Sequence, residues 1–172
     1  MNKFNQDYYK IWKSDFYTIE ANIDRSLWEN KFIKSFEKRL KKIILVIFEN
    51  SKNTLLVNNI LISLLFTGDK KVAELNNYYR KIHKSTNVLS FPSKEINNRN
   101  EIFLGDIVFS SQTITEEAKT DNKNLEDHLI HLFIHGVLHL LGYDHENEHD
   151  AHIMESLEIK ILKNLKIGNP YN

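Results

Sequence analysis

The sequence predicts one compact domain of the α/β (α+β) class, in which a small mixed β-sheet packs against helices. Its 172 residues suit a single domain and are enough to bury a substantial core. Hydrophobic residues make up 41% of the chain and charged residues 27%, a balance typical of folded proteins rather than disordered ones. Short branched apolar runs are interspersed with longer segments of helical periodicity, which favours both element types within one domain.

Four short segments predict strands because they are rich in branched and aromatic residues and are bounded by turn-forming residues. They are residues 16–19, 60–66, 87–92 and 102–109. Pro92 is expected to stop the third strand, and the polar stretch 93–101 predicts a loop. Gly105 and Asp106 are expected to interrupt the fourth strand.

Five segments carry apolar residues at helical spacing and therefore predict helices. They are residues 27–49, 69–79, 113–119, 125–141 and 148–165. Asp24 or Ser26 can cap the first helix and Asp69 the second, while Gly142 is suited to end the fourth. On the fifth helix, the residues expected to face inward are Ile153, Met154, Leu157, Ile161 and Leu165.

Charge and composition exclude several classes of protein. The 23 Lys and Arg residues balance 23 Asp and Glu residues, so attraction to a nucleic acid must come from a local patch. The chain has no cysteine, which excludes disulfides, Cys-ligated zinc, iron–sulfur clusters and thiol nucleophiles. No secretory signal or long apolar run is present, so we expect a cytoplasmic protein with no membrane partner.

Histidines are concentrated in one part of the chain. Of the eight histidines, all but His83 fall between residues 128 and 152. Four of them project from about 80° of the predicted helix at 125–141, namely His128, His131, His135 and His139. The opposite side of this helix is apolar, so these rings are expected to point into a cleft or at another element.

His135 and His139 are four residues apart, so their rings project from neighbouring turns of one helix face. Zinc-binding helices of the HExxH type hold their metal with two imidazoles at this spacing. Gly142 lets the chain leave the helix and His145 follows, which gives H-x-x-x-H-x-x-G-x-x-H, the spacing by which metzincins return a third imidazole to the metal. An isolated pair of this spacing is usually incidental, but the third histidine favours a metal site with one position open for water.

The predicted ligands are therefore His135, His139 and His145, holding one Zn2+ ion, although imidazoles also accept other divalent transition metals. We interpret His128 and His131 as hydrogen-bond partners of the ligands or as residues that line the cleft. The two remaining histidines of the segment, His149 and His152, are expected to be exposed on the last helix.

Gly136 stands where zinc peptidases carry the glutamate that acts as general base. Peptide hydrolysis through this motif is therefore disfavoured. Our hypothesis from the sequence is that Gly136 removes a side chain beside the metal and leaves room for a bulky substrate.

Three blocks of the sequence resemble one known family. Residues 135–145, HGVLHLLGYDH, look like the HGxLHLxGYDH signature of the YbeY family of rRNA-maturation endoribonucleases. Arg80 followed by residues 85–92, STNVLSFP, resembles that family's arginine and its T-[DN]-V-L-S-F-P strand. Residues 104–108, LGDIV, are similar to its LGDI-type strand. Residues 1–15 match nothing in this pattern, so we expect a variable N-terminal extension there, followed by one domain over residues 16–172.

The resemblance implies a metal-dependent endoribonuclease that hydrolyses phosphodiesters of single-stranded RNA. It implies a role in rRNA maturation, including processing of the small-subunit rRNA 3′ end, and in ribosome quality control. A zinc or similar divalent ion would lie on His135, His139 and His145, and the implied partners are rRNA and the ribosome or a ribosomal subunit, without DNA. The family also implies that Arg80 is important for activity.

The chemistry of the candidate residues is compatible with phosphodiester cleavage. A metal can lower the pKa of water towards ~7, and the guanidinium of Arg80 can grip phosphate oxygens in two places; alternatively, Arg80 is a solvated cation beside Lys81. Asp144 can orient an imidazole, take a proton or simply form a turn. Thr86, Ser90 and Phe91 can line a groove beside the metal, although a place in the core of the strand explains Phe91 at least as well. Asp106 can also line the site, but a turn at the strand edge explains it better.

Two basic clusters could track a phosphate backbone. One covers residues 34–42 of the first long helix and the other residues 80–84 before the third strand. The alternatives to an endoribonuclease are a metal-dependent hydrolase of another substrate and a non-catalytic zinc-binding, ribosome-associated protein.

Overall fold

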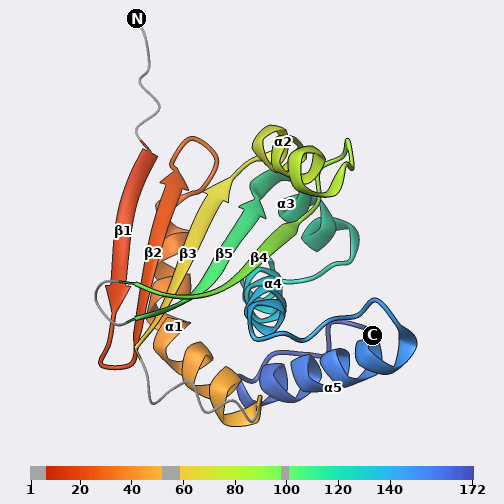
Figure 1. Ribbon diagram of the computed structural model, residues 1–172. Coiled ribbons are helices and arrows are strands. Elements are labelled where there is room, and N and C mark those ends of the chain that lie inside the picture. The colour runs from red at the N-terminus through yellow and green to blue at the C-terminus, as the bar shows by residue number, and fades with distance from the viewer. Residues whose placement is uncertain (1–6, 52–58, 98–100) are drawn as a thin grey trace, which may run out of the picture.

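A five-stranded mixed sheet forms the centre of the fold in the computed structural model, which describes residues 7–51, 59–97 and 101–172. Its strands are β1 (Asp7–Lys13), β2 (Tyr17–Asp24), β3 (Ile60–Thr67), β4 (Val88–Ile96) and β5 (Ile102–Ser110). They lie in the order β1-β2-β3-β5-β4, with β2, β3 and β5 parallel and the two edge strands β1 and β4 antiparallel to their neighbours (Figure 1).

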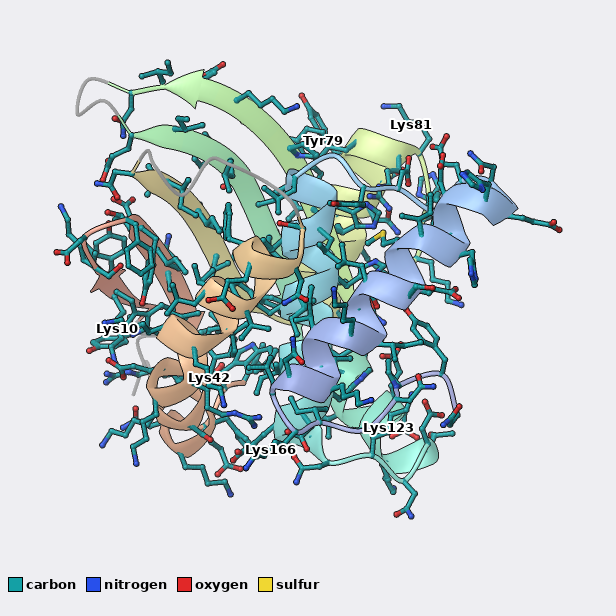
Figure 2. The ribbon with its side chains drawn as sticks, turned by 90° about the horizontal axis from the view of Figure 1, so that it is seen from below. Lys10, Lys42, Tyr79, Lys81, Lys123 and Lys166 are labelled. Atoms are coloured by element: carbon teal, nitrogen blue, oxygen red, sulfur yellow. The ribbon has the colours of Figure 1, made fainter. Side chains whose placement is uncertain are left out.

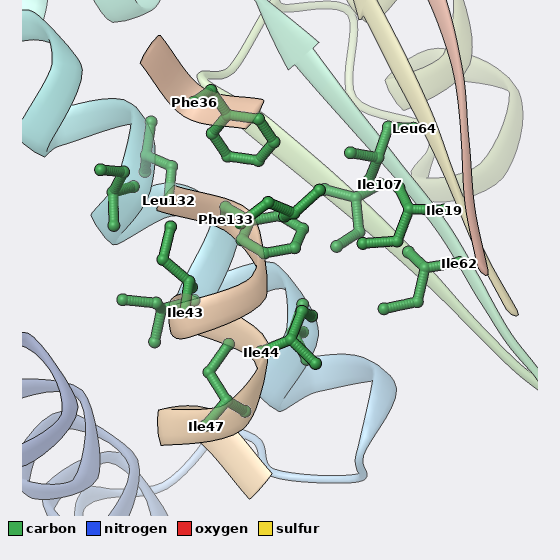
Figure 3. Packing of buried hydrophobic residues seen from close by; sticks show 14 of the residues in the cluster. Ile19, Phe36, Ile43, Ile44, Ile47, Ile62, Leu64, Ile107, Leu132 and Phe133 are labelled. Carbon is green, nitrogen blue, oxygen red and sulfur yellow. The ribbon is translucent and has the colours of Figure 1, made fainter. Parts of the chain in front are cut away.

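The helices cover the two faces of the sheet unequally. They are α1 (Asn30–Asn50), α2 (Asp69–Arg80), α3 (Ser111–Thr120), α4 (Leu125–Leu140) and α5 (Glu148–Asn164). The main core lies between one face of the sheet and α1 and α4. There the ring centroids of Phe36 and Phe133 are 5.1 Å apart, and Phe133 faces Ile107 of the sheet (Figure 3). On the other face, Val72 of α2 packs in a smaller cluster with Leu89 and Val108. One face of the sheet therefore packs against α1 and α4, and α2 covers one end of the other face.

The alternation of side chains explains this division. In β2, Ile19, Ala21 and Ile23 are buried against the helices, whereas Asn22 between them is exposed on the opposite face. The predicted class, a single domain with a mixed sheet and helices, is confirmed. Within the described ranges, no helix is both long and apolar enough to cross a lipid bilayer.

The strand β1 was not predicted from the sequence. It lies in the segment expected to be an extension, and its side chains give a weak pattern because it is an edge strand in which Tyr9 and Ile11 are 50% and 49% exposed. Trp12 alone of its aromatic side chains joins the main core. The domain boundary at residue 16 stays a prediction, and residues 1–6 of the expected extension lie outside the described residues.

Two strand predictions were wrong in detail. β4 continues through Pro92 to Ile96 instead of stopping there, because an edge strand tolerates a residue without an N–H and the pairing shifts between Pro92 and Glu95. β5 is continuous through Gly105, whose φ is +136°. A Cβ at Gly105 would lie 2.1 Å from the carbonyl oxygen of Phe91, so only glycine fits this close approach.

The helix starts also differ from the sequence predictions. α1 follows Glu29 rather than Asp24 or Ser26, since the Asp24 side chain accepts a hydrogen bond from the N–H of Ser26 at 2.9 Å within a turn. Asp69 is the first residue of α2 rather than its cap. On α5, Ile153 is 42% exposed and does not face inward as predicted.

Candidate metal centre

Helix α4 and the turn after it bring three histidines together. His135 and His139 lie on one face of α4, and Gly142 has a φ of +96°, in the left-handed region where a side chain is strained. This turn reverses the chain so that His145 returns to the other two rings. Tyr143 anchors the turn, because its hydroxyl donates to the carbonyl of Ser51 at 2.8 Å.

The three rings point their Nε2 atoms at one another. Nε2 of His139 lies 3.1 Å from Nε2 of His135 and 3.2 Å from Nε2 of His145, and one ligand atom of each residue lies within 4.8 Å of the others. Nitrogens bound about 2.1 Å from one zinc ion in a tetrahedron are separated by about 3.4 Å. The spacing therefore fits three ligands of one cation.

The hydrogen bonds of the rings explain why these nitrogens are free to bind a cation. Nδ1 of His139 donates to the carbonyl of Tyr143 at 3.0 Å, and Nδ1 of His135 donates to the Glu158 carboxylate at 2.8 Å. With the proton on Nδ1, a neutral ring presents a lone pair on Nε2. Two lone pairs 3.1 Å apart repel each other, and a cation between them would remove that repulsion.

The pKa of His139 favours the same form of the ring. Burial lowers this pKa first, and the neighbouring His135 and His145 lower it further, to about 4. The ring is therefore neutral at physiological pH, which is the form that binds metals.

Glu158 is a residue of the candidate site that the sequence did not reveal. It lies on α5 with no exposed surface and accepts hydrogen bonds from Nε2 of His131, Nδ1 of His135 and the hydroxyl of Tyr171, at 2.8, 2.8 and 2.5 Å. Burial alone would raise the pKa of Glu158, but the hydrogen bonds from both histidines and Tyr171 outweigh it and lower the pKa to about 2. A charged carboxylate thus stands behind His135, and a signal for it existed in the sequence: a glutamate at helical spacing from Met154 and Ile161.

A cavity of about 640 Å³ opens beside the three imidazoles. Arg80 from the end of α2 lines the same cavity, as do residues of β4, so the structure brings Arg80 and the histidines to one place although they are far apart in sequence. The remaining lining residues are Thr86, Asn87, Val88, Ser90, Pro92, Asp144 and Glu146. The cavity combines a candidate metal site, a guanidinium and open access from solvent.

Comparison with known proteins identifies the family. The family model described as "Endoribonuclease YbeY" matches residues 24–166. The chain belongs to the YbeY endoribonuclease family. A relative from Bartonella quintana (strain Toulouse), named Endoribonuclease YbeY, is 41% identical over 158 residues, which cover 90% of this chain and 96% of the relative. Another of that name, from Bartonella bacilliformis, is 48% identical over 113 residues, covering 64% of this chain and 71% of the relative.

A solved structure is also similar to the chain. The solution structure of TM1509 from Thermotoga maritima has a TM-score of 0.48 and 22% sequence identity, and the match covers 80% of this chain and 86% of that chain. The resemblance to the YbeY family that the sequence blocks indicate is confirmed by the family model.

Other predicted residues of this YbeY-family chain fall into two groups. Thr86 and Ser90 line the cavity, whereas Phe91 and Asp106 lie on the opposite face of the sheet, in a separate groove. Asp144 lines the cavity, and its side chain accepts a hydrogen bond from the N–H of His145 at 2.7 Å.

The additional histidines have different roles. His131 bonds to Glu158 at 2.8 Å and so shares a partner with His135, in line with the interpretation from the sequence. His128 pairs instead with Glu117 of α3 at 2.8 Å and does not line the cavity. His149 and His152 are exposed on α5, as expected.

The hypothesis that Gly136 makes room for a bulky substrate was wrong. Gly136 is buried, and a Cβ there would lie 3.0 Å from Cδ1 and Cγ2 of Ile107 and 3.2 Å from Oγ of Ser90. The glycine faces the sheet and allows α4 to pack closely on β4 and β5. Position 136 still offers no carboxylate, so peptidase chemistry at this motif stays disfavoured.

Proposed function

We propose that this chain is a zinc-dependent endoribonuclease that cleaves single-stranded RNA. Its proposed role is rRNA maturation in the cytoplasm, including the 3′ end of small-subunit rRNA, and ribosome quality control together with the ribosome or one of its subunits. The observation that carries the proposal is the convergence of three Nε2 atoms beside a cavity that Arg80 also lines. The curated relatives from Bartonella are named as endoribonucleases, which supports an RNA substrate.

His135, His139 and His145 would hold one divalent ion, with zinc proposed because a set of three imidazoles suits it. A bound ion of this kind acts as a Lewis acid on a phosphoryl oxygen and lowers the pKa of water towards ~7. Glu158 keeps the proton of His135 on Nδ1, so that Nε2 faces the cavity. The protein thus supplies a preformed set of neutral nitrogen ligands.

Arg80 would bind the phosphate that is cleaved. Its side chain is exposed at the end of α2 and lines the cavity, so a phosphate can reach it without a rearrangement of the core. A guanidinium binds two phosphate oxygens at once and stabilises the added negative charge of the transition state.

A cleavage assay on end-labelled single-stranded RNA tests this function. We expect cleavage by the metal-loaded protein, loss of cleavage with a chelator or in His139→Ala, and a decrease of about 100-fold or more in Arg80→Ala. Lys160→Ala is the control, because Lys160 is an exposed cation on α5 and does not line the cavity. Equal activity in wild type and His139→Ala would identify a contaminating nuclease and contradict the proposal.

Metal content and peptide substrates distinguish the alternatives. Elemental analysis is expected to give one zinc ion per chain in wild type and none in His139→Ala. A hydrolase of another substrate would cleave peptides or esters in a chelator-sensitive way and leave RNA intact. A purely structural zinc protein would cleave nothing and would unfold when the metal is removed.

A further inference from the structure

We propose that a groove on the sheet face opposite the histidines binds one unpaired base of the RNA, and that it prefers a base with an exocyclic amino group. The inference rests on the proposed function, because it places a second part of the same strand that is cleaved in the cavity. The groove has a volume of about 360 Å³, which is within the usual range of small-ligand sites. Its lining combines aromatic rings with polar side chains from three strands.

The edge strand β4 connects the groove to the cavity. Alternate residues of β4 face opposite sides of the sheet, so Ser90 and Pro92 line the cavity while Phe91 lines the groove. The end of α2 makes the same connection, because Tyr79 lines the groove and the next residue, Arg80, lines the cavity. An RNA strand with a phosphate bound at Arg80 therefore has only one edge of the sheet to cross before it reaches the groove.

Exposed aromatic rings form one wall of the groove and continue beyond it. Tyr79 is 59% exposed and its ring centroid lies 4.7 Å from that of Phe91, while Tyr78 is 71% exposed and lies 4.9 Å from Tyr79. Large aromatic side chains with this exposure offer stacking surfaces to unpaired bases, which is how proteins commonly bind single-stranded RNA.

The polar side chains of the groove are suited to the edge of a base. Ser63 of β3 and Asp106 of β5 are direct neighbours in the sheet, and Asn22 lines the groove from β2. Within the described part of the chain, the side chains of Ser63 and Asp106 take part in no hydrogen bond. The Asp106 carboxylate can only accept hydrogen bonds, so it favours adenine, cytosine or guanine, whose amino groups donate. Uracil offers only its N3–H, which lies between two carbonyl oxygens that repel a carboxylate.

Positive charge accompanies the aromatic rings. Arg80, Lys81 and Lys84 are exposed at and after the end of α2, and Figure 2 shows Tyr79 and Lys81 together on one side of the molecule, apart from Lys10 and Lys42. Cations beside stacking rings are the combination found in grooves that bind single strands, where they follow the phosphates. This charge favours RNA over an apolar or basic peptide as the occupant.

Equilibrium binding of fluorescent 12-nucleotide oligo(C) and oligo(U) tests the proposal. Binding is measured on the full chain with a chelator present, so that no RNA is cleaved. We expect wild type to bind oligo(C) more tightly than oligo(U), and Tyr79→Ala to weaken binding of both by about tenfold. Asp106→Asn is expected to abolish the preference for oligo(C), because an amide both donates and accepts.

Tyr9→Ala is the matched control, since Tyr9 is 50% exposed on β1 at the other edge of the sheet, and it should bind both oligonucleotides as wild type does. If Tyr79→Ala binds both oligonucleotides as tightly as wild type and Asp106→Asn keeps the preference for oligo(C), the proposed base-binding groove is overturned, even if the protein cleaves RNA. If the wild-type protein cleaves no RNA but Tyr79→Ala binds the oligonucleotides more weakly than wild type does, the groove is supported and only the proposed function is contradicted.

Discussion

Nδ1 of His135 on α4 donates a 2.8 Å hydrogen bond to the buried carboxylate of Glu158 on α5. The same carboxylate accepts hydrogen bonds from His131 and Tyr171, so three donors compensate the cost of burying its charge. The bond fixes which nitrogen of His135 faces the cavity. The orientation of one candidate ligand therefore depends on a residue 23 positions further along the chain.

We predict that Glu158→Gln weakens zinc binding by about 10- to 100-fold. The substitution preserves volume but removes the negative charge that holds the proton on Nδ1 of His135. The measurement is competition with a chromophoric chelator at neutral pH. Glu155→Gln on the same helix is the control, because Glu155 is exposed; an equal loss of affinity in both variants would contradict a specific role for Glu158.

We predict that zinc stabilises the wild-type chain and fails to stabilise His139→Ala. Free zinc at 100 times its dissociation constant should add about 2.7 kcal/mol to the free energy of unfolding. Thermal unfolding with and without zinc measures this as a rise in Tm. The exposed histidine variant His152→Ala should respond as wild type does, and a similar rise in His139→Ala would place the zinc elsewhere.

Gly136→Ala is expected to destabilise the fold by about 1–3 kcal/mol, although alanine is the better helix former by about 1 kcal/mol. The added methyl group would contact Ile107 at 3.0 Å and push α4 away from the sheet. Urea denaturation gives the difference in free energy of unfolding. Gly168→Ala, which has no neighbouring atom within 4 Å of the new Cβ, should change stability little, and equal stabilities of Gly136→Ala and wild type would refute this account of the packing.

Asp69 provides a prediction for the dependence of stability on pH. Burial raises its pKa, but hydrogen bonds from Ser110, Thr113 and Ser85 outweigh burial and hold the pKa below its usual value. Because the folded pKa lies below the unfolded one, the stabilising contribution is complete above about pH 4 and is lost as the pH falls through the folded pKa. The wild-type advantage over Asp69→Asn should therefore be largest near pH 6 and shrink towards pH 3.

Urea denaturation across this pH range measures the effect. Asp15→Asn is the control, because Asp15 is an exposed carboxylate between β1 and β2. An advantage over Asp69→Asn that stays constant from pH 6 to pH 3 would show that the charge of Asp69 contributes nothing.

The parts of the fold that local pattern determines could be predicted from the sequence. The helix with the histidines was expected at 125–141 and is found at Leu125–Leu140, because its apolar spacing and Gly142 are local signals. β1 was missed because an edge strand buries few side chains. The end of β4 was misplaced because the tolerance of Pro92 depends on β4 being an edge strand, which only the assembled sheet reveals.

The candidate site divides in the same way. The spacing of His135, His139 and His145 is a property of one helix and one turn, so the sequence alone was sufficient to predict that these residues lie close together. The positions of Glu158 and Asp106 relative to the histidines could not be predicted in this way, because they depend on how α5 and β5 pack against the other elements. Gly136 was expected to leave open space beside the metal. That expectation failed because its neighbour Ile107 comes from a strand that is distant in the sequence.

The order of the residues around His135 has a consequence for how the protein is made. The three imidazoles occupy residues 135–145, and a ribosome that adds about 5–20 residues per second completes them before the carboxylate on α5 that secures one of them. An unfinished or cleaved copy without α5 would carry all three of these imidazoles but would lack Glu158, whose carboxylate orients His135. We therefore expect such a copy to bind the metal more weakly than the complete chain, because nothing holds the ring of His135 in place.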